Sequence, residues 1–331
     1  MKILYLVKYL FIPFSIVYYL IVSLRNFFYD TSIFKRYSFK NKVISVGNIT
    51  WGGTGKTPLA IYITRLLLDN NKKPAILIRG YGEDEYKLFS RLIPDVPVGV
   101  GKDRIKEGKR LLTHSSIDTF VLDDGFQHRR IDRDLDIVCI DSLDPFGNDL
   151  LIPAGSMREP LMSLSRGDIF LITKVDLCAS KKRSDDLVKK LKSINPKAII
   201  AKAVYRLDYF YDIKDGSKID GSKLRNKELV LVSGIASPRS FENTILNLGM
   251  KIKKHFAFRD HYFYSGINLK RIEEFCRANN IDGFIVTEKD AVKIKPIAEK
   301  SNVKIYVASI SLEIIENKDE FHNRLFTIYN S

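Results

Sequence analysis

The sequence predicts an α/β fold: a P-loop NTPase-type parallel sheet with helices on both faces, a second α/β lobe and an N-terminal membrane-associated helix. Short, almost continuously apolar runs alternate with segments of helical period, and a glycine-rich stretch ending in Lys-Thr follows the first of these runs. Strands that are apolar throughout are covered on both faces, which is typical of parallel sheets. At 331 residues, 45% hydrophobic and 28% charged, the chain is long enough for two lobes.

The stretch from Val43 to Pro58, VISVGNITWGGTGKTP, predicts a strand, a phosphate-binding loop and the start of a helix. Its glycines can take positive φ and let backbone N–H groups surround a phosphate. Lys56 can reach the β- and γ-phosphates, and the Thr57 hydroxyl can ligate Mg²⁺. The first glycine of the usual G-x-x-x-x-G-K-[ST] spacing is replaced by Thr50. A plain glycine-rich turn is the alternative, but the lysine and hydroxyl favour a nucleotide site at Gly52, Gly53, Thr54, Gly55, Lys56 and Thr57.

The first 24 residues are apolar and aromatic, with a basic start but without the small-residue cleavage site of a signal peptide. The uncharged run from Tyr9 to Leu24 is shorter than the roughly 20 residues that span a bilayer, and Pro13 interrupts it. Aromatic side chains with flanking lysines and arginines favour a helix lying at an anionic membrane surface. A helix buried against the catalytic core is the alternative.

Helical patterns are expected at Leu59 to Asn70, Glu83 to Ile93 and Arg104 to Thr113, between the strands of a first lobe. A second α/β series begins near Asp168. The predicted organisation is therefore a membrane-associated segment at 1–40, a nucleotide-binding lobe at 41–160 and a second lobe at 161–331. In such sheets, ligands bind at the carboxyl ends of the strands.

The stretch VLDDGFQH predicts a Walker-B-like element, because an apolar strand ends there in Asp123 and Asp124. Two adjacent carboxylates are costly unless a cation or partner neutralises them. A carboxylate at this position of a P-loop protein holds Mg²⁺ directly or through water. A solvated loop is the alternative for the acidic pair alone.

Three further stretches have weaker signals. His261, within FRDHYFYS, is a candidate general base, although a satisfied surface histidine is the default interpretation. Arg158 and Glu159, in PAGSMREP, are candidates for phosphate and metal contacts, or else form a loop before a helix. TKVD at 173–176 resembles the guanine-specifying NKxD element of GTPases, with Thr in place of Asn.

The net charge of +15 indicates an anionic partner, such as a nucleotide, acidic lipid, nucleic acid or phosphorylated substrate. No recognition helix or aromatic–basic module supports nucleic acid. Cys139, Cys178 and Cys276 are odd in number and widely spaced, which favours a reducing compartment over a disulfide framework or zinc site.

Taken in order, GGTGKT, RGYG, DDGFQHR, LIPAGSMREP, DHYFYS and TEKD resemble the tetraacyldisaccharide 4′-kinase family, the lipid A 4′-kinases. The resemblance extends over nearly the whole chain. It implies a monotopic enzyme on the cytoplasmic face of the bacterial inner membrane. Such an enzyme transfers the ATP γ-phosphate, with Mg²⁺, to the 4′-hydroxyl of a tetraacylated glucosamine disaccharide 1-phosphate.

The resemblance also implies residue roles. Asp84, in Glu83-Asp84-Glu85, takes the role of the acidic partner of His261, and the two residues would come from different lobes. In this chain Tyr81 and Asp84 are only three positions apart, where family members carry an inserted stretch. The implied catalytic residues are Asp84, His261 and Lys56, the metal ligands Thr57, Asp123, Asp124 and Glu159, and the substrate or phosphate contacts Arg158, Gln127 and His128.

A second class of function fits part of the pattern: a membrane-associated P-loop GTPase or ATPase that acts as a switch or targeting factor. The TKVD stretch and the basic charge favour it, whereas REP and DHY have no place in it. Nucleotide preference and the need for a lipid acceptor would discriminate between the two.

Overall fold

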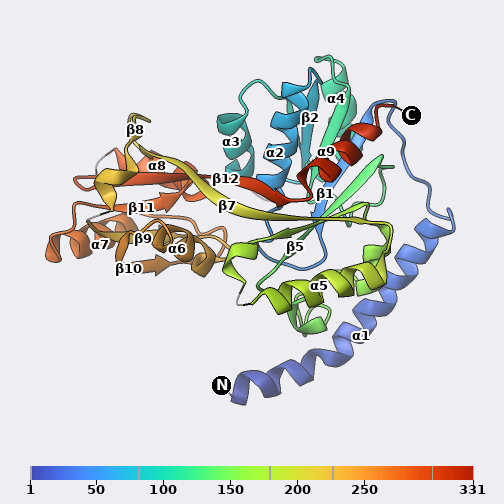
Figure 1. Ribbon diagram of the computed structural model, residues 1–331, viewed down its shortest axis with the longest axis horizontal. Coiled ribbons are helices and arrows are strands. Elements are labelled where there is room, and N and C mark those ends of the chain that lie inside the picture. The colour runs from blue at the N-terminus through green and yellow to red at the C-terminus, as the bar shows by residue number, and fades with distance from the viewer. Residues whose placement is uncertain (1, 81–82, 179, 226, 300, 331) are drawn as a thin grey trace. The chain divides into compact units, whose positions relative to one another are not determined.

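The computed structural model describes residues 2–80, 83–178, 180–225, 227–299 and 301–330, and two compact units are present in it (Figure 1). Unit 1 comprises Met1–Gly80, Ile93–Val204 and Ile314–Ser331, and unit 2 comprises Tyr81–Leu92 and Tyr205–Glu313.

Unit 1 contains a parallel sheet in the order β7-β6-β5-β1-β4-β2-β3. Its first strand, β1, has β4 on one side and β5 on the other, so the loop that follows β1 lies at the centre of the sheet's carboxyl edge. The elements of unit 1 are α1 (Lys2–Asp30), β1 (Lys42–Asn48), α2 (Lys56–Asp69), β2 (Pro74–Ile78), β3 (Val98–Val100), α4 (Arg104–Leu112), β4 (Thr119–Asp123), β5 (Leu135–Asp141), β6 (Ile169–Thr173), α5 (Lys181–Ile194), α9 (Lys318–Thr327) and short 3₁₀ turns η1 (Gly147–Asp149), η2 (Leu161–Arg166) and η3 (Val175–Leu177).

Helices cover both faces of this sheet. On one face, Leu111 of α4 packs with Val43 of β1, and Leu187 of α5 packs with Val138 of β5. Alternation along β1 places Val43 and Gly47 on the same face, and Gly47 pairs with Val138, so α4 and α5 share that face. On the other face, α2 and α9 lie together (Figure 1).

The amino-terminal helix α1 has two different sides. By length and composition, its segment Leu10–Asp30 is apolar enough to cross a membrane. Leu10, Phe14 and Leu20 are well exposed, whereas Ser15 and Asn26 are buried against unit 1. A helix with one docked polar stripe and one bare apolar face is suited to a membrane surface.

Unit 2 contains the parallel strands β10-β9-β11-β12, followed by β7 and its antiparallel partner β8. Its elements are α3 (Glu83–Leu92), β8 (Lys218–Ile219), η4 (Gly221–Leu224), β9 (Glu228–Ser233), α6 (Pro238–Leu246), β10 (Lys251–Ala257), α7 (Gly266–Ala278), β11 (Gly283–Thr287) and α8 (Glu288–Ala298). The strands β7 (Ile199–Asp212) and β12 (Lys304–Glu316) each begin in one unit and end in the other.

The predicted fold class is confirmed: the parallel strands, the loop after β1 and the apolar N-terminal helix are all present. The unit boundaries differ from the expected lobes. Strand β6 and helix α5 belong to unit 1 because β6 pairs with β5. Helix α3, expected in the first lobe, belongs to unit 2 because it packs on α8.

Candidate active site

The loop between β1 and α2 has the backbone of a phosphate-binding loop. Gly52 has φ +126° and Gly55, the N-cap of α2, has φ +99°. An added Cβ on Gly52 would meet nothing within 4 Å, so its backbone conformation, and not its surroundings, requires glycine there. Beyond Gly55, the first turn of α2 offers free N–H groups and the positive end of its dipole to an anion.

Two side chains at the end of β6 and directly after it hold this loop in place. Thr173 donates its hydroxyl to the carbonyl of Thr54 (2.9 Å), and buried Lys174 donates to the carbonyl of Gly53 (2.9 Å). Lys174 also pairs with Asp141 at the end of β5. The TKVD stretch therefore has a structural task within unit 1, which its short resemblance to a GTPase element could not reveal.

The Walker-B-like element meets the start of α2. The Thr57 hydroxyl donates to Asp123 (2.9 Å), and burial raises the pKa of Asp123, while Lys56 opposes that rise. Burial would also raise the pKa of Asp124, but Lys56 and Arg158 outweigh it and lower that pKa to about 2. Arg158 binds Asp124 through two hydrogen bonds, of 2.6 and 3.1 Å, and Lys56 lies 3.6 Å away.

This donor set fits a divalent cation. Thr57, Asp123 and Asp124 offer the hydroxyl and carboxylate oxygens that Mg²⁺ takes when it is also bound to nucleotide phosphates. Burial raises the pKa of Asp123, and a cation beside the carboxylate would act with Lys56 and Arg104 to stabilise its ionised form.

Glu159 is a correction to the expected metal ligands. Its carboxylate is fully buried, and both oxygens are engaged, by Arg25 (2.8 Å), Asn26 (3.0 Å) and Arg166 (2.8 Å). Two of these partners belong to α1, so Glu159 fastens that helix to unit 1. The sequence placed Glu159 beside Arg158, but the Arg158 guanidinium binds Asp124 while the Glu159 carboxylate is held by partners away from that site.

The three residues expected to contact substrate or phosphate differ in their surroundings. Arg158 lies at the site and also donates to Asn48 (3.2 Å), and Gln127 donates its amide N–H to the Asn48 carbonyl (2.8 Å). His128 is partly buried near Arg104 and Arg133, and burial followed by these charges lowers its pKa to about 4. Its ring is therefore neutral at pH 7.

Arg104 is a site residue that the sequence did not reveal. It is almost completely buried and donates to the backbone carbonyls of Asp123 (2.6 Å) and Asp124 (3.1 Å). This arginine fixes the turn in which Asp124 has φ +54°, a conformation rare outside glycine. An arginine at the start of a polar helix gives no sequence signal of burial.

A second constellation lies within unit 2. Asp84 on α3 accepts a hydrogen bond from the Nδ1 of His261 (3.0 Å), but both residues belong to unit 2 and not, as expected, to different lobes. That hydrogen bond, together with Lys293 at 3.2 Å, outweighs burial and holds the pKa of Asp84 well below its usual range. Lys289 lies 3.2 Å from the other ring nitrogen, Nε2. The sequence placed these lysines in the TEKD region but gave them no role.

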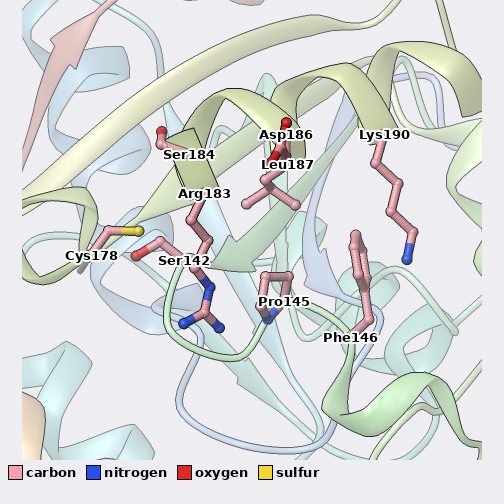
Figure 2. A pocket seen from close by; sticks show the side chains of 9 residues that line it. All are labelled: Ser142, Pro145, Phe146, Cys178, Arg183, Ser184, Asp186, Leu187 and Lys190. Carbon is pink, nitrogen blue, oxygen red and sulfur yellow. The ribbon is translucent and has the colours of Figure 1, made fainter. Parts of the chain in front are cut away.

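A separate pocket of about 190 Å³ lies in unit 1 beside the start of α5 (Figure 2). It contains none of the expected site residues, and the Lys190 ammonium lies over the Phe146 ring, 4.4 Å from its centroid. Its lining residues are Ser142, Pro145, Phe146, Cys178, Arg183, Ser184, Asp186, Leu187 and Lys190.

A P-loop with its acidic partner strand, and a carboxylate–histidine pair of the kind that accepts a hydroxyl proton, define a P-loop phosphotransferase. The comparisons with known proteins give the particular family. The sequence model of the family Tetraacyldisaccharide-1-P 4′-kinase matches residues 7–330, and the chain belongs to this family.

Individual relatives agree with this assignment. The tetraacyldisaccharide 4′-kinase of Syntrophus aciditrophicus is 33% identical, over 93% of this chain and 90% of the relative. That of Halothermothrix orenii is 32% identical, over 90% and 87%. Among solved structures, the "apo" form of LpxK from Aquifex aeolicus in complex with ATP has a TM-score of 0.75 and 27% identity, over 98% of this chain and 99% of that one.

Proposed function

We propose that this chain is an ATP-dependent kinase that phosphorylates the 4′-hydroxyl of a tetraacylated glucosamine disaccharide 1-phosphate, giving lipid IVA in lipid A biosynthesis. The hydrogen bond between Asp84 and His261 carries the proposal, because a nucleotide switch has no use for a group that accepts a hydroxyl proton. Family membership supports the same reaction.

At the nucleotide end, the backbone N–H groups of the loop and the Lys56 ammonium bind the β- and γ-phosphates of ATP. Thr57, Asp123 and Asp124 would hold Mg²⁺, which when bound neutralises charge on the transferring phosphoryl group. Arg104 and Arg158 keep the acidic pair in place. These residues mainly position the phosphates and stabilise charge, which is most of what phosphoryl transfer asks of a protein.

At the acceptor end, the sugar hydroxyl loses its proton to the imidazole of His261. The hydroxyl oxygen then forms a bond to the γ-phosphorus, and the bond from that phosphorus to the β,γ-bridging oxygen breaks, with its electron pair passing to ADP. Asp84 orients the ring and stabilises the imidazolium, as the aspartate of a catalytic triad does.

The competing GTPase interpretation loses its main support. Thr173 and Lys174 are occupied in holding the phosphate loop through the carbonyls of Thr54 and Gly53. The TKVD stretch is thereby accounted for without a guanine base.

We also propose that α1 lies on the cytoplasmic face of the inner membrane and gives the enzyme access to a substrate that stays in the bilayer. Its bare apolar side chains and the surrounding lysines and arginines suit an anionic lipid surface. A monotopic attachment leaves the docked side of the helix on unit 1.

The test is transfer of phosphate by the purified full chain from Mg-ATP to the disaccharide 1-phosphate lipid in mixed micelles, followed by mass spectrometry. We expect a product heavier by one phosphoryl group. Lys56→Ala and Asp124→Ala should nearly abolish turnover, whereas Asp95→Ala, an exposed acidic residue of the same unit, should not. Failure of folded wild-type protein to modify the lipid, or tight GTP binding with slow hydrolysis, would overturn the proposal.

A further inference from the structure

Two lysines of α8 contact the Asp84–His261 pair. Lys289 Nζ lies 3.2 Å from His261 Nε2 and 3.2 Å from Asp260 Oδ1. Lys293 Nζ lies 3.2 Å from Asp84 Oδ2, and both of these side chains are about nine-tenths buried. Positions 289 and 293 are one helical turn apart, so both ammonium groups face the pair from a single helix.

The partners of the imidazole determine where its proton resides. A carboxylate only accepts hydrogen bonds, so Asp84 requires the proton on Nδ1. An ammonium only donates, so Lys289 requires a lone pair on Nε2. In the opposite tautomer, two donors, the Nε2–H and the Lys289 ammonium, would face each other. Two acceptors, Nδ1 and the Asp84 carboxylate, would also face each other.

The backbone of His261 is also held in place, by a hydrogen bond to its neighbour Asp260. His261 has φ +56°, a conformation rare outside glycine, and its backbone N–H donates to Asp260 (3.0 Å). Asp260 thus contacts both the backbone of His261 and the ammonium of Lys289. The ring is fixed by contacts on both of its nitrogens and on its own main chain.

We propose that Lys289 and Lys293 are positioning residues of the proton-accepting pair. Lys293 compensates the charge of Asp84, and Lys289 holds the lone pair of His261 on Nε2, the nitrogen that takes the hydroxyl proton. The assignment of a hydroxyl as the proton donor rests on the proposed kinase function.

Lys289 must also give up this contact when the hydroxyl arrives. Asp260 offers it a second partner at the same distance of 3.2 Å, so the ammonium stays paired after it leaves Nε2. The substrate hydroxyl then replaces Lys289 as the hydrogen-bond donor to Nε2. The proton on Nδ1 stays where it is, so the tautomer does not change.

The first test is spectroscopic and does not depend on turnover. With ¹⁵N-labelled histidine, wild-type His261, assigned by comparison with a His261→Gln spectrum, should show a protonated Nδ1 and an unprotonated, hydrogen-bonded Nε2. Lys289→Met should move the Nε2 resonance toward that of a free lone pair, while Lys289→Arg, which keeps a donor, should restore it. The matched control is Lys295→Met, at an exposed position on the same helix. A proton on Nε2 in the wild type, or an Nε2 resonance indifferent to Lys289→Met, would overturn the proposal.

The second test is kinetic. Lys289→Met and Lys293→Met should each lower kcat by about 10- to 100-fold, because a misplaced base loses its alignment, with the KM values for ATP and lipid little changed. Equal kcat in wild type and Lys289→Met would contradict the positioning role. If the wild type itself transferred no phosphate to the lipid, the kinase function would fall, and the histidine spectra would still decide the role of the lysines.

Discussion

The acidic pair of the phosphate site shows how single side chains set local charge. Asp123 and Asp124 are neighbours, yet the pKa of the first is raised and that of the second is lowered to about 2. Burial raises the pKa of Asp123, which accepts from the neutral hydroxyl of Thr57, whereas Lys56 and Arg158 outweigh burial at Asp124. Asp124 is therefore ionised at physiological pH.

Protonation of His128 should make the stability of the folded protein depend on pH. Its pKa is about 4 in the folded protein and near 6.5 when unfolded, so the unfolded chain binds more protons between these values. Stability should therefore fall as the pH drops from about 6.5 to 4. The effect has an upper bound of about 3 kcal/mol, reduced by solvent screening because the ring is only partly buried.

The measurement for His128 is urea unfolding at pH 7 and pH 4.5, compared with His128→Gln. The stability difference between the two pH values should be smaller in the variant. His114→Gln, in the turn after α4, serves as a control and should behave as the wild type does. Identical pH dependence of wild type and His128→Gln would contradict the assignment.

Removal of either member of the Asp84–His261 pair should affect catalysis more than binding. Asp84→Ala and His261→Ala are expected to lower kcat by about 10²- to 10⁴-fold, the usual contribution of a positioned base. Nucleotide affinity, measured by calorimetry, should change little, because the phosphate loop belongs to unit 1 and both residues belong to unit 2. Normal kcat in His261→Ala would exclude it as the proton acceptor.

At the scale of elements, α1 combines two tasks on opposite sides. Its docked side donates from Tyr18 to the carbonyl of Arg158 (2.9 Å) and from Ser15 to the carbonyl of Leu151 (2.9 Å). The backbone N–H of Arg158 in turn donates to the carbonyl of Ile49 (2.8 Å). The helix thus holds the backbone of an arginine whose side chain binds Asp124.

Mutations on the two sides of α1 should affect different properties, membrane binding on one side and stability on the other. Deletion of residues 1–24 should release the protein from membranes. The double variant Phe14→Ser, Leu20→Ser removes exposed apolar side chains and should weaken vesicle binding without changing Tm. Tyr18→Phe should lower stability by about 1 kcal/mol through the lost hydrogen bond, and leave vesicle binding unchanged.

Vesicle flotation and thermal unfolding measure the two properties of α1. The matched control is Tyr19→Phe, since Tyr19 is 46% exposed beside docked Tyr18. It should leave Tm unchanged. Tight membrane association after deletion of residues 1–24 would show that another surface carries the attachment.

At the scale of the whole molecule, the charge of +15 should steer the protein to anionic lipid. Binding to vesicles containing acidic phospholipid should exceed binding to neutral vesicles, and should weaken when salt is raised from 0.05 to about 0.5 M, because the screening length shortens. Co-sedimentation with vesicles of both compositions measures this. Salt-independent binding, equal on both vesicles, would assign the attachment to apolar contacts alone.

Much of this molecule could be predicted from the sequence, because apolar periodicity and motif residues are local. The strands of the sheet, the loop at residues 52–57 and the acidic pair followed from stretches of a few residues each. The partners of Glu159 did not, since Arg25 lies 134 positions away. Lys174 and Gly53, 121 positions apart, are another such contact. Residues brought together by tertiary packing alone leave no pattern in a single sequence.

The interruption of unit 1 by α3 has a consequence for how the protein is synthesised. The chain enters and leaves unit 2 twice, so no single cut in the gene yields two contiguous halves that correspond to the units. Asp84 leaves the ribosome 177 residues ahead of His261, its hydrogen-bonding partner. During translation, the phosphate loop and its acidic strand are therefore synthesised long before the proton-accepting pair exists, whereas unit 1 itself is completed only when its last segment, Ile314–Ser331, has been made.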